Sequence, residues 1–213
     1  MSKINSICLV AMLVMTIVSV SNFLGFSIAG ISVIVGIVFF FINRVLEKNT
    51  SSDTGLNVKA IGINLKDKSI LFWIGLPLVI NIVCFILATL FLPEFIEHIY
   101  LRTEFMVSLD KILLLVLQLA ILALGEEIAW RGFFQRQLSK WLPIIPTLIL
   151  TSLLFSLGHL AVGNIVVVSY DIFFIFINSV LYGVVFYKTN NAWISAISHF
   201  IANLFIVIVI AFF

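Results

Sequence analysis

Residues 112–133 read ILLLVLQLAILALGEEIAWRGF, an apolar run that ends in charged residues. As a helix this stretch is about 33 Å long, which is enough to cross the hydrocarbon core of a bilayer. Two adjacent carboxylates, Glu126 and Glu127, lie toward its end, and Arg131 follows. An ionised carboxylate in hydrocarbon is costly unless it is paired or serves a function. The segment therefore predicts both a membrane-spanning helix and a functional site within the membrane.

Similar apolar runs fill the rest of the chain. Of its 213 residues, 62% are hydrophobic and 10% are charged, against about 25% charged in an ordinary soluble domain. Leu, Ile, Val and Phe occupy consecutive rather than alternating positions, which favours helices over a membrane β-barrel. The sequence therefore predicts an all-α, polytopic transmembrane helix bundle with about seven spans. The spans are expected near 4–21, 23–42, 70–92, 112–133, 144–162, 165–187 and 192–212.

One long polar stretch, residues 43–69, separates two groups of apolar runs. Its Asn, Ser, Thr, Asp and Gly residues predict a polar cytoplasmic loop. We expect this loop to divide an N-terminal two-helix membrane hairpin, residues 1–42, from a catalytic helical core, residues 70–213. The net charge of +2, without a basic stripe, argues against a nucleic-acid partner.

The placement of Lys and Arg predicts the orientation, because cytoplasmic loops hold an excess of positive residues. With the N-terminus inside, ten positive residues fall at cytoplasmic ends or loops, and only Arg102 and Lys111 fall outside. The sequence therefore predicts a multi-pass cell-membrane protein with its N-terminus inside and its C-terminus outside. The external loop 93–110 is acidic, and we expect His98 within it to be solvated. The ten residues are Lys3, Arg44, Lys48, Lys59, Lys66, Lys68, Arg131, Arg136, Lys140 and Lys188.

The two adjacent glutamates are expected to have different partners. Glu127 and Arg131 are four residues apart on one helix face, with the acid first, which is the favoured order for an ion pair. Glu126 points about 100° away, and the residue four positions after it is Trp130, which cannot neutralise a charge. Glu126 is thus left free to exchange a proton with water, as a general base and acid must.

Other intramembrane polar residues fall on later spans. His159 shares a helix face with Phe155, and His199 lies four residues before Asn203. Counting 1.5 Å per residue from the cytoplasmic ends puts Glu126, His159 and His199 at similar depths, roughly 15–20 Å. These side chains are therefore able to meet. Four further polar residues are expected to form interhelical hydrogen bonds, with a functional role left open for Asp171; the four are Asn81, Asp171, Asn178 and Tyr182.

Three of these patterns resemble the EExxxR, FxxxH and HxxxN motifs of the CAAX-protease and bacteriocin-processing (Abi, CAAX prenyl protease 2-like) family of intramembrane proteases. The motifs occur in order, each on its own expected helix, between about residue 126 and residue 203. They are Glu126-Glu127-Ile-Ala-Trp-Arg131, Phe155-Ser-Leu-Gly-His159 and His199-Phe-Ile-Ala-Asn203.

The resemblance implies an endopeptidase that cleaves membrane-associated peptides or proteins within the bilayer, reached from the cytoplasmic side. It implies that Glu126 and His159 activate water, that His199 and Asn203 stabilise the oxyanion, and that Glu127 and Arg131 support them. It leaves the oligomeric state open. The bacterial branch of the family implies a plasma-membrane location and a role in bacteriocin processing or self-immunity.

Two alternatives stay open at this point. Glu126, His159 and His199 also form a common catalytic zinc set, although no H-E-x-x-H occurs and Asn203 would then lack a role. We therefore favour a mechanism without a cofactor and keep zinc as the alternative. A non-catalytic membrane immunity or binding protein, in which the polar residues join helices, is the alternative function. A proton relay is disfavoured because the polar residues cluster at one depth.

Overall fold

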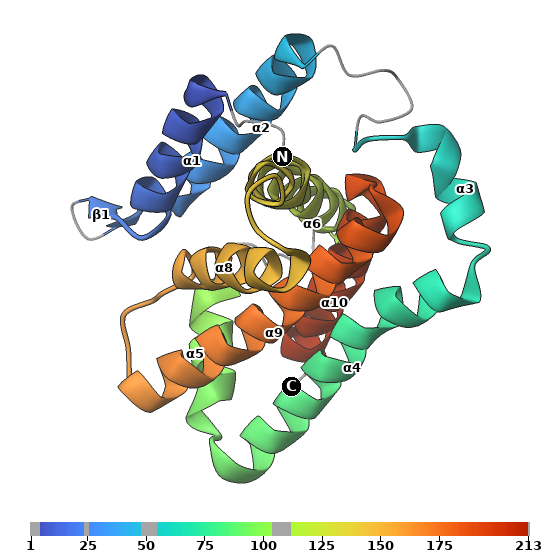
Figure 1. The fold of residues 1–213 in the computed structure, drawn as a ribbon. Helices are drawn as coiled ribbons and strands as arrows, with labels where there is room; N and C mark the ends of the chain where they lie inside the picture. The colour runs from blue at the N-terminus through green and yellow to red at the C-terminus, as the bar shows by residue number, and fades with distance from the viewer. Residues whose placement is uncertain (1–4, 24–25, 48–54, 104–111, 213) are drawn as a thin grey trace.

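The computed structural model describes residues 5–23, 26–47, 55–103 and 112–212, and it is an all-helical bundle apart from one small β-hairpin (Figure 1). Among these residues, five helices are long and apolar enough to cross a membrane. They are α2 (Ala29–Leu46), α4 (Lys68–Phe91), α6 (Ile112–Glu127) with its continuation to Leu138, α9 (Ile165–Thr189) and α10 (Ala192–Phe212).

Two of the seven expected spans are shorter than predicted. Helices α1 (Ser6–Ser19) and α8 (Ile144–Leu157) have 14 residues each, or about 21 Å against a hydrocarbon core of about 30 Å. Helix α1 ends before a short hairpin of two-residue strands, β1 (Asn22–Phe23) and β2 (Phe26–Ser27). Because of this hairpin, α2 begins later than predicted, at Ala29. Helix α8 begins at Ile144, as predicted, but it ends at Leu157 because the chain turns at Gly158 and His159.

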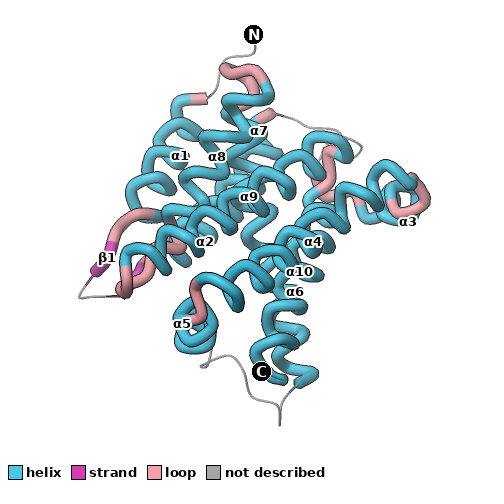
Figure 2. Tube along the Cα trace, turned by 90° about the horizontal axis from the view of Figure 1, so that it is seen from below, coloured by secondary structure: helices cyan, strands magenta, loops and turns pink. Residues whose placement is uncertain are grey.

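Two polar connections contain helices that the sequence did not predict. The expected external loop includes α5 (Glu94–Thr103), and the expected cytoplasmic loop includes η1 (Val58–Ala60) and α3 (Ile61–Asn64). Figure 2 shows α7 (Arg136–Leu138) at one end of the bundle and β1 and α5 at the opposite end. The expected division into hairpin, loop and core remains a prediction.

A π-helical segment, η3 (Ile128–Gln135), continues α6 at the centre of the bundle (Figure 1). All eight of its residues are buried, and it packs against α2, α8, α9 and α10. Gly36 of α2 permits the closest approach, because a Cβ there would lie 2.5 Å from the Ala129 Cβ. Such π-turns recur at functional sites. Here the turn lies just after the two adjacent glutamates and contains Arg131.

The turn between α9 and α10 fixes these two helices side by side. Asn190 ends α9 in the left-handed region, at φ 47°, a conformation that Asn tolerates better than most residues. Asn191 Nδ2 then donates to the Asn57 carbonyl at 2.8 Å, and the Ala192 N–H donates to the Gly55 carbonyl at 2.8 Å. These bonds tie the turn to the segment before η1.

Positive residues lie at the α7 end of the bundle, including Arg136 in α7 itself. Lys140 contacts Glu47 there, and Lys188 lies over the Trp73 ring, 5.3 Å from its centroid. Arg131 does not belong to this group, because it is fully buried in η3. The orientation inferred from the positive residues, with the N-terminus inside, remains a prediction. Of the twelve positive residues, Lys3, Lys48 and Lys111 lie outside the described residues.

Candidate active site

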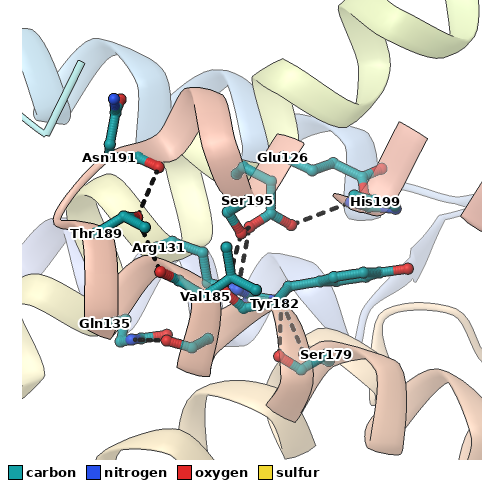
Figure 3. Close-up of polar contacts among 12 residues, drawn as sticks. Glu126, Arg131, Gln135, Ser179, Tyr182, Val185, Thr189, Asn191, Ser195 and His199 are labelled. Carbon is teal, nitrogen blue, oxygen red and sulfur yellow. Dashed lines mark hydrogen bonds and ion pairs between the residues drawn. The ribbon is translucent and has the colours of Figure 1, made fainter. Parts of the chain in front are cut away.

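Glu127 and Arg131 form an ion pair in the centre of the bundle. Neither side chain is exposed, and Arg131 Nε lies 3.3 Å from Glu127 Oε2. The pairing predicted from their spacing is confirmed. Arg131 also donates from Nη2 to the carbonyl and the hydroxyl of Ser179, at 3.2 and 3.0 Å. The guanidinium is therefore held between α6 and α9 (Figure 3).

Two residues of α10 complete the surroundings of Glu127. Ser195 donates its hydroxyl to Glu127 Oε2, and His199 Nδ1 lies 3.0 Å from Glu127 Oε1. A carboxylate paired with an arginine accepts hydrogen bonds and donates none, so His199 Nδ1 carries the proton. Glu127 is thus surrounded by donors from three directions, which is what a buried carboxylate requires.

His199 is held in position on a second side by Tyr182 of α9. The two rings are stacked, with centroids 4.5 Å apart and planes 15° apart, and Figure 3 shows the tyrosine ring lying along the imidazole. The other ring nitrogen, Nε2, lies 3.8 Å from Glu126 Oε2. His199 therefore links the two glutamates, one at each nitrogen.

Glu126 has a different environment from Glu127. Its side chain is 24% exposed, and it borders two cavities, of about 270 and 190 Å³. The larger cavity lies between Glu126, α9, α10 and α5, and the smaller one lies toward α1 and α2. Glu126 is thus the carboxylate of the pair that water and substrate are able to reach.

His159 borders the same two cavities from α8. It lies just past the helix end, and its Nδ1 is 2.9 Å from the Phe155 carbonyl. Because a carbonyl only accepts, Nδ1 carries the proton, and a neutral His159 has its free lone pair on Nε2. Phe155 packs between the histidines, with ring centroids 4.7 Å from His159 and 6.1 Å from His199.

The four residues predicted to be catalytic all line the larger cavity: Glu126, His159, His199 and Asn203. They come from three different helical segments that are far apart in the sequence. The similar depths estimated from the sequence were compatible with this arrangement. The packing of α8 against η3 and of α10 against α6 brings the residues together.

Sequence reasoning missed several residues of the site. Ser195 lies four residues before His199, so it is on the same helix face, and this spacing was a usable signal. Ser179 and the stacking of Tyr182 on His199 depend on how α9 packs against α6 and α10, and no local pattern indicates them. The expected interhelical bond was correct for Asn178, whose Nδ2 donates to Asn81 Oδ1 at 2.6 Å.

A second polar cluster lies at the far end of the larger cavity. Asp171 of α9 accepts from Arg102 of α5, and His98 Nε2 lies 3.1 Å from the same carboxylate oxygen. The expectation that His98 is solvated was wrong, because its side chain is 10% exposed. Helix α5 places it against Asp171. The cavity thus extends from Glu126 to the end of the bundle at which α5 lies.

Glu126, His159 and His199 are the candidate metal ligands. Within the described ranges, no group of three or more His, Cys, Asp and Glu side chains is arranged to hold a metal ion. His199 Nδ1 is bonded to Glu127, and His159 Nδ1 to a backbone carbonyl. These bonds leave Nε2 of each ring available, as in metal-binding histidines, but Glu126, His159 and His199 as placed do not come together as one metal-binding group.

Residues 108–205 match the family model described as type II CAAX prenyl endopeptidase Rce1-like. Over this segment, somewhat less than half of its length, the chain is similar to that family. The match includes the four residues predicted to be catalytic, the Glu127–Arg131 pair and the π-helical segment. At the family level it supports an intramembrane protease, and the apolar helices make the chain a multi-pass membrane protein. No curated protein and no solved structure matches the chain.

Proposed function

We propose that the protein is an intramembrane endopeptidase that hydrolyses peptide bonds of membrane-associated substrates without a metal. The observation that carries the proposal is the shared cavity, in which a partly exposed carboxylate, two histidines and an asparagine meet inside an Rce1-like helical core. A bundle that used these residues only to join helices would have no need of a cavity at their meeting point.

In this proposal, Glu126 and His159 activate the attacking water. Both border the two cavities, and Nε2 of a neutral His159 is free to accept a hydrogen bond from water. In the proposed step, the water oxygen bonds to the carbonyl carbon while its proton moves to the Glu126 carboxylate. The carbonyl electron pair moves onto its oxygen. Glu126 then gives that proton to the leaving amine as the C–N bond breaks.

Oxyanion stabilisation falls to His199 and Asn203. Because His199 Nδ1 already donates to Glu127, Nε2 donates to the oxyanion only when the ring carries both protons. Such an imidazolium also balances the charges of the site, with two carboxylates opposing one guanidinium and one imidazolium. A preorganised donor at an oxyanion contributes about 2.7–4 kcal/mol in enzymes studied by mutagenesis. Glu127, Arg131 and Ser195 hold His199 in the required position.

The apolar lining of the cavity suits a membrane-associated peptide or a lipid-modified chain end. The family description favours a CAAX-type substrate, and the resemblance noted above favours bacteriocin processing or self-immunity in a bacterial plasma membrane. We propose the general activity for this chain, with the prenylated and unprenylated substrates as separate arms of the test.

The test is cleavage of an internally quenched peptide that ends in a CAAX sequence, with and without a farnesyl group, by protein reconstituted in vesicles. We expect the wild type to cleave at least one arm, and Glu126→Gln to reduce kcat/KM by about 10²–10⁴-fold. Cleavage should survive chelation. Loss on chelation with recovery on zinc addition would contradict the metal-free mechanism. Equal cleavage by the Glu126→Gln variant would contradict the role of Glu126, and an absence of wild-type cleavage in both arms would favour a binding protein.

The side of entry is a second part of the proposal. The cavity extends toward α5 and Arg102, whereas Arg136 and Lys140 lie at the opposite, α7 end. With the N-terminus inside, this arrangement places the α5 end outside the cytoplasm, whereas the family resemblance implies cytoplasmic access. We propose that the charge asymmetry sets the orientation, and that substrate enters from the external side.

Cysteine labelling tests the side of entry. Cys8 and Cys84 are buried, so the wild type is the unlabelled control. We expect a membrane-impermeant maleimide to label Glu97→Cys on α5 in intact cells, and to label Ser139→Cys, beyond α7, only after permeabilisation. Both positions are exposed. The reverse pattern would support cytoplasmic access.

A further inference from the structure

A chain of side-chain amides crosses the wall of the larger cavity. Asn81 Nδ2 donates to the Ala202 carbonyl at 3.0 Å, and Asn178 Nδ2 donates to Asn81 Oδ1 at 2.6 Å. A peptide carbonyl only accepts, so the Asn81 amino group must face Ala202. Its oxygen is then left for Asn178, whose amino group must face it in turn. The backbone of α10 thereby fixes the orientation of both amides.

The remaining atom of this chain, Asn178 Oδ1, is buried and has no hydrogen-bond partner among the described residues. Asn178 is 8% exposed and lines the same cavity as Glu126 and His199. Apolar side chains such as Leu119, Leu122 and Phe174 line that cavity with it, and none supplies a donor. A buried acceptor without a partner is uncommon in folded proteins and calls for an explanation.

The position of Asn178 relates it to the proposed reaction centre. It precedes Tyr182 by one helical turn on α9, about 6 Å along the axis, and Tyr182 stacks on His199. An extended peptide advances about 6.6 Å in two residues. A substrate whose scissile carbonyl lies at His199 therefore brings a backbone group two residues away to the level of Asn178.

We propose that Asn178 is a substrate-binding residue, whose Oδ1 accepts a hydrogen bond from a backbone N–H of an extended substrate two residues from the scissile bond. The inference rests on the proposed protease function. It gives the site a means to set the register of a peptide independently of its side chains. It also predicts that Pro, which lacks the N–H, is rejected at that position.

The test replaces single backbone N–H groups of the quenched peptide by ester oxygens, at each position from three residues before to three after the scissile bond. We expect one ester, two residues from that bond, to lower wild-type kcat/KM about tenfold, the effect of a lost hydrogen bond to a buried group. In Asn178→Leu the parent peptide should be slower by a similar factor, and the same ester should change the rate less than twofold.

Leu122→Ala is the control, because it changes another side chain of the same cavity wall and leaves both amides of the chain in place. It should keep its sensitivity to the ester. If the ester has the same effect in the wild type and in Asn178→Leu, the inference is overturned. If Asn178→Leu does not fold, the wild-type scan decides, and a scan without a sensitive position overturns the inference. Equal cleavage of the parent peptide by wild type and Glu126→Gln would instead overturn the proposed function.

Discussion

Glu126 and Glu127 are neighbours in sequence, yet they lie in opposite kinds of environment. Glu127 is fully buried and contacts Arg131, Ser195 and His199, whereas Glu126 borders two cavities and has its nearest charged neighbour, His199, at 3.8 Å. One step of about 100° around a helix separates these environments. The difference teaches that a buried charge in this bundle is structural where its partners are complete, and available for chemistry where they are not.

Replacing the buried Glu127 is expected to have the largest effect on stability. Glu127→Leu leaves the Arg131 guanidinium buried without its counter-charge, which typically costs about 3–5 kcal/mol. Unfolding in mixed micelles, titrated with a denaturing detergent, measures the loss. The double variant Glu127→Leu with Arg131→Met removes both charges and should recover most of it. A double variant as unstable as the sum of the single variants would show that the ion pair is not the source.

Tyr182 stacks on His199, which lies between Glu127 and Glu126. Its replacement should have a smaller effect, and on activity. Tyr182→Leu removes the ring stacked on His199, an interaction of about 0.5–1.5 kcal/mol, so kcat/KM should fall by about 2–10-fold. Tyr182→Phe keeps the ring and should stay within twofold of the wild type. A large loss in Tyr182→Phe would contradict a stacking role and assign one to the hydroxyl.

The pair Glu47–Lys140 gives the smallest effect, because it lies outside the membrane-spanning segments at the α7 end. Burial alone would raise the pKa of the Glu47 carboxyl, but the hydrogen bond and charge of Lys140 outweigh burial and hold the pKa below its ordinary value. A lowered carboxyl pKa stabilises the fold at neutral pH, and this stability is lost as the pH falls through the folded-state pKa.

Lys140→Met should therefore destabilise the protein by no more than about 1 kcal/mol at pH 7, and the difference from wild type should shrink on acidification. Unfolding curves at neutral and acidic pH measure this. A difference that grows at low pH would contradict the assignment. If the prediction holds, breaking the exposed Glu47–Lys140 pair destabilises the protein severalfold less than breaking the buried Glu127–Arg131 pair.

Local patterns in the sequence predicted the parts of the site that one helix determines. The spacing of Glu127 and Arg131 predicted their pairing, and the same spacing from His199 would have indicated Ser195. Contacts between helices were not predictable in this way. The stacking of Tyr182 on His199 depends on packing, and so does the contact of His98 with Asp171.

The errors in the fold also have physical causes. Helix α5 is short and charged, so it resembles a loop in a search for apolar runs. The π-helical segment buries Arg131 because neighbouring helices cover every side of it, and charge counting along the sequence contains no information on that burial. Helix α1 is short because a β-hairpin follows it, and α8 is short because the chain turns at Gly158 and His159.

The central claim is that Glu126 activates water while Glu127 holds the site together. Cleavage and unfolding measured on the same reconstituted samples of wild type, Glu126→Gln and Glu127→Gln test it most directly. We expect Glu126→Gln to unfold like the wild type and to lose about 10²–10⁴-fold in kcat/KM, and Glu127→Gln to be clearly less stable. A Glu126→Gln protein that cleaves at the wild-type rate, or that is destabilised as much as Glu127→Gln, would contradict this division of roles.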